Sequence, residues 1–181
     1  MLPAEVAAYK AADFINFCDA YDIPVLSLTN VKGYAADVRS EKSIAKAVAK
    51  LTYAFANANV PKVNVITGEA YGSAYVTMNS KALGADVTYA WPDASIGMMD
   101  ANEAAKIMYA DDIAKSADVQ SVISEKAAEY AALQSGVESA AARGYVDTII
   151  NPEDTRKYVA AAFEMLYTKR EDRPDKKHGT V

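Results

Sequence analysis

Short β-rich runs alternate with longer alanine-rich stretches along this 181-residue chain, and this alternation limits its fold more than any other feature. The strand-length runs are residues 25–29, 62–67, 86–90 and 146–150, with a short extended piece at 94–99. The stretches with helical periodicity are residues 4–20, 40–58, 73–81, 117–133 and 152–167, with a further helix after Asp100. Such alternation predicts an α/β fold, in which a mainly parallel sheet is covered by helices. The continuous apolar run at 25–29 suits a strand covered on both faces.

The connecting segments carry recognisable turn and capping residues. Residues 30–39 are expected to form a loop that bends at Gly33, and Ser40 is expected to cap the helix that follows it. Asp100 and Glu103 have the spacing of a capping box at the start of a later helix.

The sequence lacks the side-chain sets of the common nucleophilic and metal-dependent enzymes. Its only histidine is His178, and no Ser-His-Asp, Cys-His or metal-ligand spacing occurs. A Gly-x-Gly-x-x-Gly dinucleotide motif is also missing. The sequence therefore predicts no metal site and directs attention to backbone groups.

Charge and hydropathy exclude other classes of function. The net charge of −5 and the lack of a basic cluster before the tail argue against nucleic-acid binding, and Lys176-Lys177-His178 is interpreted as a solvated terminus. No apolar stretch approaches the roughly 20 residues that span a bilayer, so direct membrane insertion is not expected. The single cysteine, Cys18, lies among apolar residues, which predicts a buried thiol and fits a reducing cytoplasm.

Two glycine-containing segments follow predicted strands. Gly33 follows the first strand, and a turn expected at 68–72 follows the second. The carboxyl ends of parallel strands lie at one edge of the sheet, where ligands of α/β proteins bind. The N–H groups of Ser73 and Ala74 would begin a helix without intrahelical partners, so they are candidate donors to an oxyanion. The spacing alone favours a tight strand-to-helix connection that binds nothing.

The order of residues in this turn resembles the oxyanion motif of the crotonase superfamily, Gly-x-Ala-x-Gly-Gly-Gly/Ala. The matching segment is Gly68-Glu69-Ala70-Tyr71-Gly72-Ser73-Ala74, followed at the right distance by Gly84-Ala85-Asp86-Val87-Thr88-Tyr89-Ala90. Further matches are Val60-Pro61-Lys62-Val63, Asn79-Ser80-Lys81 and Tyr89-Ala90-Trp91-Pro92. From about Lys10 to the Lys-Lys-His-Gly ending at 176–179, the chain is similar to the C-terminal half of the carboxyltransferase subunits of biotin-dependent acyl-CoA carboxylases and decarboxylases.

This resemblance implies a crotonase-like ββα spiral and the exchange of a carboxyl group between carboxybiotin and the α-carbon of an acyl-CoA. In that family the site lies between two crotonase-like halves from different subunits. The N-terminal half holds the acyl-CoA, and the C-terminal half faces biotin, which a separate carrier protein brings. The implied partners are therefore an N-terminal acyl-CoA-binding half, a biotin carrier protein and further copies in a homo-oligomer. No metal is implied, and biotin can itself take the α-proton.

The resemblance also implies roles for individual residues. Carried over by position, the N–H groups of Ser73 and Ala74 would hold the ureido oxygen of biotin, and the loop with Gly33 and Tyr34 would line the same site. The residues that would contact biotin are Gly72, Tyr71 and Tyr75. Packing explains the two tyrosines equally well.

Three features depart from the family pattern. The common Asp-Val-Pro-Gly-Phe is here Asn30-Val31-Lys32-Gly33-Tyr34, and the missing proline removes rigidity. Ser73 replaces a common glycine, which is harmless only if its φ is negative. Residues 1–168 would form the C-terminal domain without its opening strands or the acyl-CoA half, and residues 169–181 would form a tail.

Other polar and sulfur-containing residues near the motif have simpler explanations. The basic residues whose spacing is typical of a solvated helix face are Lys32, Arg39, Lys42 and Lys46. Met98 and Met99 are expected in the core. Asp100 and Glu103 lie where some crotonases carry a catalytic carboxylate, yet capping accounts for both.

Two other functions stay open from the sequence. The first is a stand-alone crotonase-type hydratase or isomerase acting on an acyl-CoA, which needs a carboxylate that the sequence does not convincingly offer. The second is a non-catalytic assembly module, because the small residues of its helices permit close packing between subunits.

Overall fold

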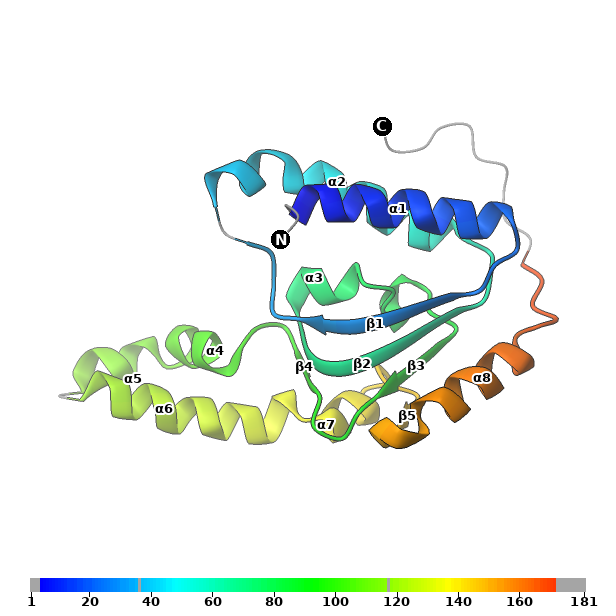
Figure 1. Ribbon diagram of the computed structural model, residues 1–181. Coiled ribbons are helices and arrows are strands. Elements are labelled where there is room, and N and C mark those ends of the chain that lie inside the picture. Colours follow the sequence, from blue (N-terminus) through cyan, green and yellow to red (C-terminus); the bar gives the residue numbers. More distant parts are fainter. Residues whose placement is uncertain (1–3, 36, 117, 172–181) are drawn as a thin grey trace.

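A five-stranded sheet, parallel in every pairing, runs through the computed structural model, which describes residues 4–35, 37–116 and 118–171 (Figure 1). The strands are β1 (Val25–Val31), β2 (Lys62–Tyr71), β3 (Val87–Ala90), β4 (Ser95–Gly97) and β5 (Thr148–Ile149). Their order is β1-β2-β3-β5, and β4 also pairs with β2. The first half of the ten-residue strand β2 pairs with β3, and its second half pairs with β4. The predicted α/β class and parallel sheet are confirmed.

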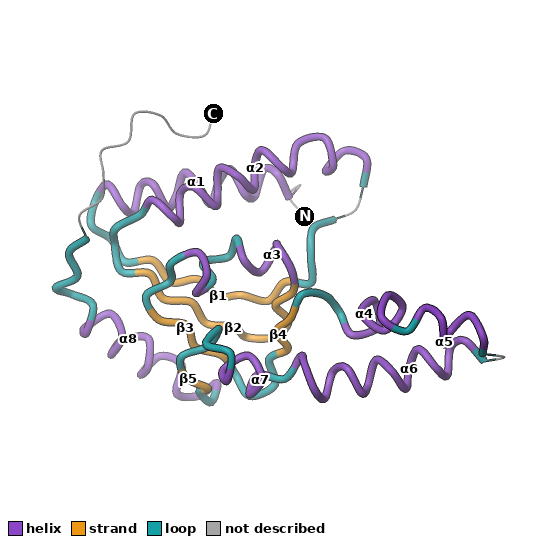
Figure 2. Tube along the Cα trace, turned by 180° about the vertical axis from the view of Figure 1, so that it is seen from behind, coloured by secondary structure: helices purple, strands orange, loops and turns teal. Residues whose placement is uncertain are grey.

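Helices cover the sheet from both sides (Figures 1 and 2). The α-helices are α1 (Ala4–Ala20), α2 (Val38–Asn57), α3 (Gly72–Val76), α4 (Ala101–Met108), α5 (Ala110–Lys115), α6 (Val119–Tyr130), α7 (Val137–Ala142) and α8 (Thr155–Met165). Shorter turns of helix are η1 (Lys81–Leu83), the π-helical η2 (Ala131–Ser135) and η3 (Pro152–Asp154). Among the described residues, no helix has the length and apolar run that crossing a bilayer requires.

The α1–α2 pair forms the layer above the sheet, on the same side as α3 (Figure 2). Small and apolar residues three or four positions apart on α1 face α2, and the buried ones are Ala8, Ala12, Ile15 and Cys18. They meet a matching stripe on α2, which contains Ala47, Leu51, Ala54 and Phe55. Alanines let two helices approach closely. Cys18 is 2% exposed, and burial raises the pKa of its thiol, so the predicted buried thiol is confirmed.

Helix α8 covers the opposite face of the sheet, but only in part. Val63 and Val65 of β2 are fully buried against a cluster that includes Val159 of α8. Their neighbours on β1, Leu26 and Leu28, face the same way and are 42% and 59% exposed. The expectation that this strand is covered on both faces is therefore wrong for the described residues.

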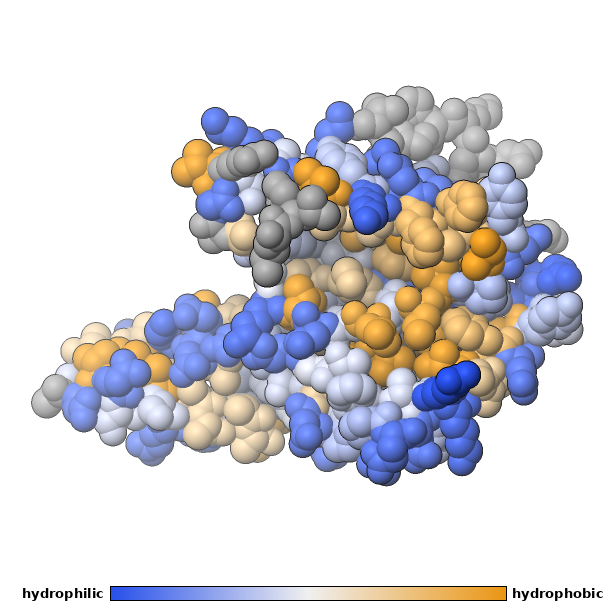
Figure 3. All heavy atoms as spheres, in the orientation of Figure 1, coloured by the Kyte–Doolittle hydropathy of each residue, from blue (hydrophilic) through white to orange (hydrophobic). Residues whose placement is uncertain are grey.

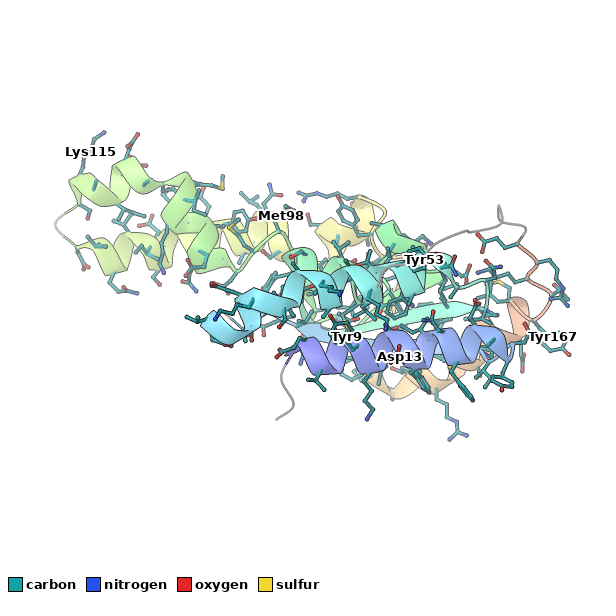
Figure 4. The ribbon with its side chains drawn as sticks, turned by 90° about the horizontal axis from the view of Figure 1, so that it is seen from above. Tyr9, Asp13, Tyr53, Met98, Lys115 and Tyr167 are labelled. Atoms are coloured by element: carbon teal, nitrogen blue, oxygen red, sulfur yellow. The ribbon has the colours of Figure 1, made fainter. Side chains whose placement is uncertain are left out.

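Helices α4, α5 and α6 form an arm that projects from the sheet, with Lys115 at its far end (Figures 1 and 4). Its core is small, and its buried residues are Ala104, Ala105, Ile123 and Ala127. The two ends of the arm meet at the sheet, where Ser95 of β4 bridges to Gly136.

Helix starts differ from the prediction at one of two capping sites. Helix α2 begins at Val38, and Asp37 is its cap, because its carboxylate accepts hydrogen bonds from the Ser40 N–H at 2.9 Å and the Ser40 hydroxyl at 2.7 Å. The expected capping role of Ser40 is wrong. Asp100 does cap α4, accepting from the Asn102 N–H at 2.9 Å, whereas Glu103 pairs with a lysine in the next turn.

Several other helix and strand boundaries differ from the prediction. Strand β1 runs to Val31, into the expected loop, and the helix expected over 117–133 begins at Val119 and passes into π-helical geometry after Tyr130. Strand β5 has only two residues, Thr148 and Ile149, which pair with Tyr89 and Ala90 of β3. At the C-terminal end, Lys169 is fixed to the body by Asp86 at 2.9 Å, and Lys176-Lys177-His178 lies outside the described residues.

Candidate functional site

The strand-to-helix junction lies later than the sequence predicts. Residues 68–71 continue β2, and the last three of them pair with β4, so the turn expected at 68–72 is reduced to the step from Tyr71 to Gly72. The side chain of Asn30 explains the glycine at 68, because a Cβ there would lie 2.8 Å from the Asn30 amide oxygen. The register between β1 and β2 shifts at the same place, after Thr29.

Gly72 has a backbone conformation that only glycine adopts easily. Its φ is +59°, and a Cβ on it would lie 3.0 Å from the Met98 carbonyl oxygen. The chain can therefore turn from β2 directly into α3 while it passes close to the end of β4. The next residue, Ser73, is not among the described residues with positive φ, so serine fits here without strain.

The first turn of α3 presents backbone donors. The first N–H groups of a helix have no partner inside it, and in α3 these belong to Gly72, Ser73 and Ala74. Ser73 is exposed and Ala74 is 3% exposed. The following segment is held on the sheet, because the Asn79 side-chain amide donates to the Val63 carbonyl oxygen at 3.4 Å and the Thr29 hydroxyl lies 3.4 Å from the Met78 carbonyl oxygen.

The loop after β1 reaches the same helix, as the shared sheet edge predicts. The Tyr34 hydroxyl lies 2.9 Å from the Thr77 hydroxyl and donates to the Ser73 carbonyl oxygen at 3.4 Å. Gly33, next to it, is exposed, and a Cβ there would meet nothing within 4 Å. The structure therefore brings the two loops together. Steric crowding does not require a glycine at position 33.

A pocket of about 460 Å³ lies along α3, β4 and α7. Its lining includes Gly72, Ser73, Tyr75, Ile96, Met98, Ala140, Arg143 and Tyr145. Figure 4 shows Met98 where the arm joins the body. Met98 is 77% exposed, so its expected place in the core is wrong: it follows the end of β4, where its backbone packs on Gly72 and its side chain faces outward.

The two tyrosines of the motif differ in environment. Tyr75 lines the pocket and is 7% exposed, and its hydroxyl has no hydrogen-bond partner among the described residues. Burial, and to a smaller degree Tyr145, raises the pKa of the Tyr75 phenol to about 12. Tyr71 is buried outside this lining, and burial raises its pKa against the opposing effect of a hydrogen bond with Ser95.

Charged residues near the turn are engaged elsewhere. Lys32 pairs with Glu69 at 2.9 Å, and this contact raises the pKa of the lysine. Lys42 and Lys46 are exposed on α2, as a solvated face predicts, and the side chain of Arg39 lies outside the described part. Within the residues that the structure describes, no group of three His, Cys, Asp or Glu side chains could hold a metal ion.

Sequence reasoning missed the far wall of the pocket. Gln134, Arg143 and Tyr145 lie 60 or more positions after Ala74, the end of the motif, and Arg143 donates a hydrogen bond to the Gln134 amide oxygen. No local pattern marks them, because only the return of the chain from the arm into α7 brings them beside α3.

Comparison with known proteins identifies the family. The profile of the carboxyl transferase domain matches residues 4–181. The chain is 50% identical over 176 residues to a putative propionyl-CoA carboxylase beta chain of Bacillus subtilis strain 168, covering 97% of this chain and 35% of that protein. It is 44% identical over 174 residues to the methylmalonyl-CoA carboxyltransferase 12S subunit of Propionibacterium freudenreichii subsp. shermanii, covering 96% and 33%.

Comparison with solved structures supports the same family. The crystal structure of a transcarboxylase 12S hexamer, with methylmalonyl-coenzyme A and methylmalonic acid bound, superposes with a TM-score of 0.91 at 44% identity, covering 96% of this chain and 34% of that one. The beta subunit of Pseudomonas aeruginosa geranyl-CoA carboxylase gives a TM-score of 0.80 at 27% identity, covering 96% and 34%. The chain thus spans about one third of the length of these relatives, and its crotonase-like α/β fold is confirmed. It belongs to the carboxyl transferase domain family.

Proposed function

We propose that this chain is the biotin-facing, C-terminal half of an acyl-CoA carboxyltransferase or decarboxylase. The reaction moves a carboxyl group between carboxybiotin and the α-carbon of an acyl-CoA. The observation that carries the proposal is the junction at Gly72, where a left-handed glycine turns β2 into α3 and leaves first-turn N–H groups beside the pocket. The relatives named as propionyl-CoA carboxylase and methylmalonyl-CoA carboxyltransferase support the reaction class.

Backbone donors would stabilise the charge that develops on biotin. The N–H groups of Ser73 and Ala74 would donate to the ureido oxygen, and a removed donor of this kind typically costs about 3–4 kcal/mol of transition-state stabilisation. The loop with Gly33 and Tyr34 would close the same site, since the Tyr34 hydroxyl lies 2.9 Å from the Thr77 hydroxyl on the segment after α3.

The pocket suits the largely apolar ring system of biotin. Tyr75 would contribute its ring to the wall against which biotin packs, since its hydroxyl is itself buried. Gly72 lines the pocket, so its backbone would contact the ring, while its missing Cβ leaves room for the Met98 carbonyl oxygen. Tyr71, packed beneath the turn, would support this wall by its contact with the end of β4. When bound, biotin supplies the carboxyl group and takes the α-proton.

The proposed binding partners are inferred from the part of the relatives that has no counterpart in this chain. About two thirds of their length has no counterpart here, and an N-terminal half that binds the acyl-CoA would come from that part. A biotin carrier protein would deliver biotin, and the hexamer of the 12S relative supports a homo-oligomer. The free, buried thiol of Cys18 is compatible with a cytoplasmic assembly.

The test is carboxyl transfer from carboxybiotin to propionyl-CoA by the chain combined with an acyl-CoA-binding half. Ser73→Pro removes one N–H donor and should slow transfer by roughly 10²- to 10³-fold. Ser73→Ala keeps the N–H and removes only the hydroxyl, so it serves as the matched control and should retain most of the activity. Equal activity in both variants would refute the role of the turn.

A further inference from the structure

The lining of the pocket beside α3 contains a single charged side chain. Among the described residues that line the pocket, Arg143 alone is charged, and the others are small, apolar or neutral polar residues. The guanidinium donates to the amide oxygen of Gln134, and within the described part of the chain it forms no ion pair. A positive charge therefore lies at the pocket wall without a carboxylate beside it.

The backbone around Arg143 is fixed by the end of α7. Gly144 follows with a φ of +81°, and its N–H donates to the Ala141 carbonyl oxygen at 3.0 Å. The Tyr145 N–H donates to the Ala140 carbonyl oxygen at 3.0 Å, which completes a Schellman motif. These bonds do not use the arginine side chain. A cation near a helix C-terminus is favourable in general, but that effect does not require a position in the lining of a pocket.

The partner of Arg143 lies in an unusual turn of helix. Gln134 belongs to the π-helical η2, and π-helical turns within helices frequently occur at functional sites. Because its side chain is neutral, Gln134 holds the guanidinium without cancelling its charge. A guanidinium has several N–H donors, so this one bond leaves others for a ligand. The two side chains together have the composition of an anion site whose cation is oriented in advance.

A carboxylate attached to a neutral, largely apolar ring fits this pocket. The walls at Ile96, Met98 and Ala140 suit the ring, but a guanidinium gains little from an uncharged group. A carboxylate can accept two parallel N–H···O bonds from a guanidinium, and such charge-assisted pairs are among the strongest hydrogen bonds in proteins. Carboxybiotin has both parts, because its ureido ring carries the carboxyl group on one of its nitrogens.

We propose that Arg143 binds the carboxylate of carboxybiotin, and that Gln134 is the positioning residue that orients its guanidinium. The inference rests on the proposed function and adds to it a residue that discriminates between the carboxylated and the free cofactor. Arg143 holds the carboxylated ring more tightly than the free ring, which favours release once the carboxyl group has moved to the acyl-CoA. This role is separate from that of the backbone N–H groups of α3, because Arg143 lies at the end of α7.

Two stable probes that differ only in charge test the site on the full chain. N-carboxymethyl-imidazolidinone has the ureido ring of biotin with a carboxylate attached through one nitrogen, and its primary amide is the neutral match. Ligand-observed saturation-transfer NMR gives the dissociation constant of each probe. The wild-type chain should bind the carboxylate about tenfold or more tightly than the amide, because hydrogen bonds between charged groups are stronger than those of a neutral group.

Substitutions separate the charge from the structure of the wall. Arg143→Gln should bind the two probes with affinities within about twofold of each other, and Arg143→Lys, which keeps the charge, should retain part of the preference. Gln134→Glu keeps a hydrogen-bond acceptor for Arg143 but neutralises its charge, so it should also lose the preference. Circular dichroism verifies that each variant folds.

Arg156→Gln is the matched control for the same chemical change. Arg156 is an exposed arginine of α8 that lines a separate groove beside Leu26 and Leu28. Figure 3 shows the face of the molecule on which apolar side chains gather over β1 and α8. This variant should keep the full preference for the carboxylate, because Arg156 does not line the pocket beside α3.

Steady-state kinetics of the chain combined with an acyl-CoA-binding half give a second measurement. Arg143→Gln should raise the KM for carboxybiotin by about tenfold, because the carboxylate loses its partner. In the reverse direction, the KM for free biotin should change by less than about twofold, since the free ring has no carboxyl group on its nitrogen.

Several results would overturn the inference. They are a wild-type chain that binds the two probes equally or binds neither, and an Arg143→Gln chain that keeps the preference for the carboxylate. Equal loss of both probes in Arg143→Gln would also overturn it, because the arginine would then only shape the pocket. A wild-type chain that shows the preference but transfers no carboxyl group in the complex would refute the proposed function while supporting the carboxylate site.

Discussion

The side-chain amide oxygen of Asn30 accepts a hydrogen bond from the backbone N–H of Glu69 at 3.0 Å, and it does so directly over Gly68. The contact joins β1 to β2 where their register shifts. It holds in place the stretch of β2 that leads to the turn at Gly72. The glycine of the motif is therefore matched to a particular side chain on the neighbouring strand.

This pairing predicts a coupled pair of substitutions. Asn30→Ala should lower the free energy of unfolding by about 1 kcal/mol, because a partly exposed hydrogen bond is lost. Gly68→Ala should destabilise wild type by displacing the Asn30 side chain, but it should have little effect in the Asn30→Ala background. Urea unfolding of the wild type, the two single variants and the double variant measures the coupling free energy between the two positions. Strictly additive effects would show that Asn30 does not explain the glycine.

Gly72 and Gly33 form a second matched pair. Gly72→Ala must adopt a left-handed φ of +59° with its Cβ 3.0 Å from the Met98 carbonyl oxygen, so it should destabilise the protein by about 1–3 kcal/mol. Gly33→Ala meets nothing within 4 Å and should change stability little. Thermal unfolding distinguishes the two variants. A larger effect at Gly33 than at Gly72 would contradict the geometry of the turn.

The buried hydroxyl of Tyr75 predicts an effect at high pH. Because the folded pKa is raised to about 12, above the ordinary value of about 10, the folded state favours the protonated phenol. The resulting stability is fully present below pH 10 and is lost as the pH rises through 12. Tyr75→Phe should therefore weaken the alkaline loss of stability between pH 10 and 12. The measurement is the melting temperature as a function of pH, with Tyr167→Phe, 82% exposed in wild type, as control.

At neutral pH, the same Tyr75→Phe substitution removes a buried polar atom that has no partner among the described residues. Stability should be unchanged or rise by up to about 1 kcal/mol, because an unsatisfied hydroxyl is costly to bury. A clear loss of stability in urea unfolding would mean that the hydroxyl has a partner in the folded protein.

Asp86 links the C-terminal segment to the sheet. Its carboxylate contacts the Lys169 ammonium at 2.9 Å and accepts from the Lys62 N–H at 2.8 Å, and the two paired side chains are only 18% and 13% exposed. Asp86→Ala should cost about 1–3 kcal/mol, because the Lys62 N–H loses its acceptor and the Lys169 ammonium keeps only Glu171 at 3.5 Å and the Val60 carbonyl oxygen at 3.3 Å. Glu103→Ala, which breaks an exposed pair with Lys106, should cost under about 1 kcal/mol in the same denaturant titration.

The sequence was sufficient for the fold class and for the two loops at one sheet edge, because periodicity and glycine position are local signals. It placed the strand-to-helix junction wrongly, since Glu69 to Tyr71 stay in the sheet through pairing with β4 on one side and, at Ala70, with Val31 of β1 on the other. The exposed position of Met98 and the pocket wall at Arg143 and Tyr145 depend on distant contacts, which no local pattern encodes. Capping at Asp37 was missed because Ser40, three positions later, is also a good capping residue.

The bridge between Ser95 and Gly136 also bears on how this chain can change during evolution. The arm leaves the body beside β4 and returns to it at the same place, so the length of polypeptide between these two points does not alter the strand order of the sheet. Insertions and deletions near the connection between α5 and α6 should be tolerated, as they are at exposed loop tips in general. The arm can thus change in length without any change in the backbone around Gly72.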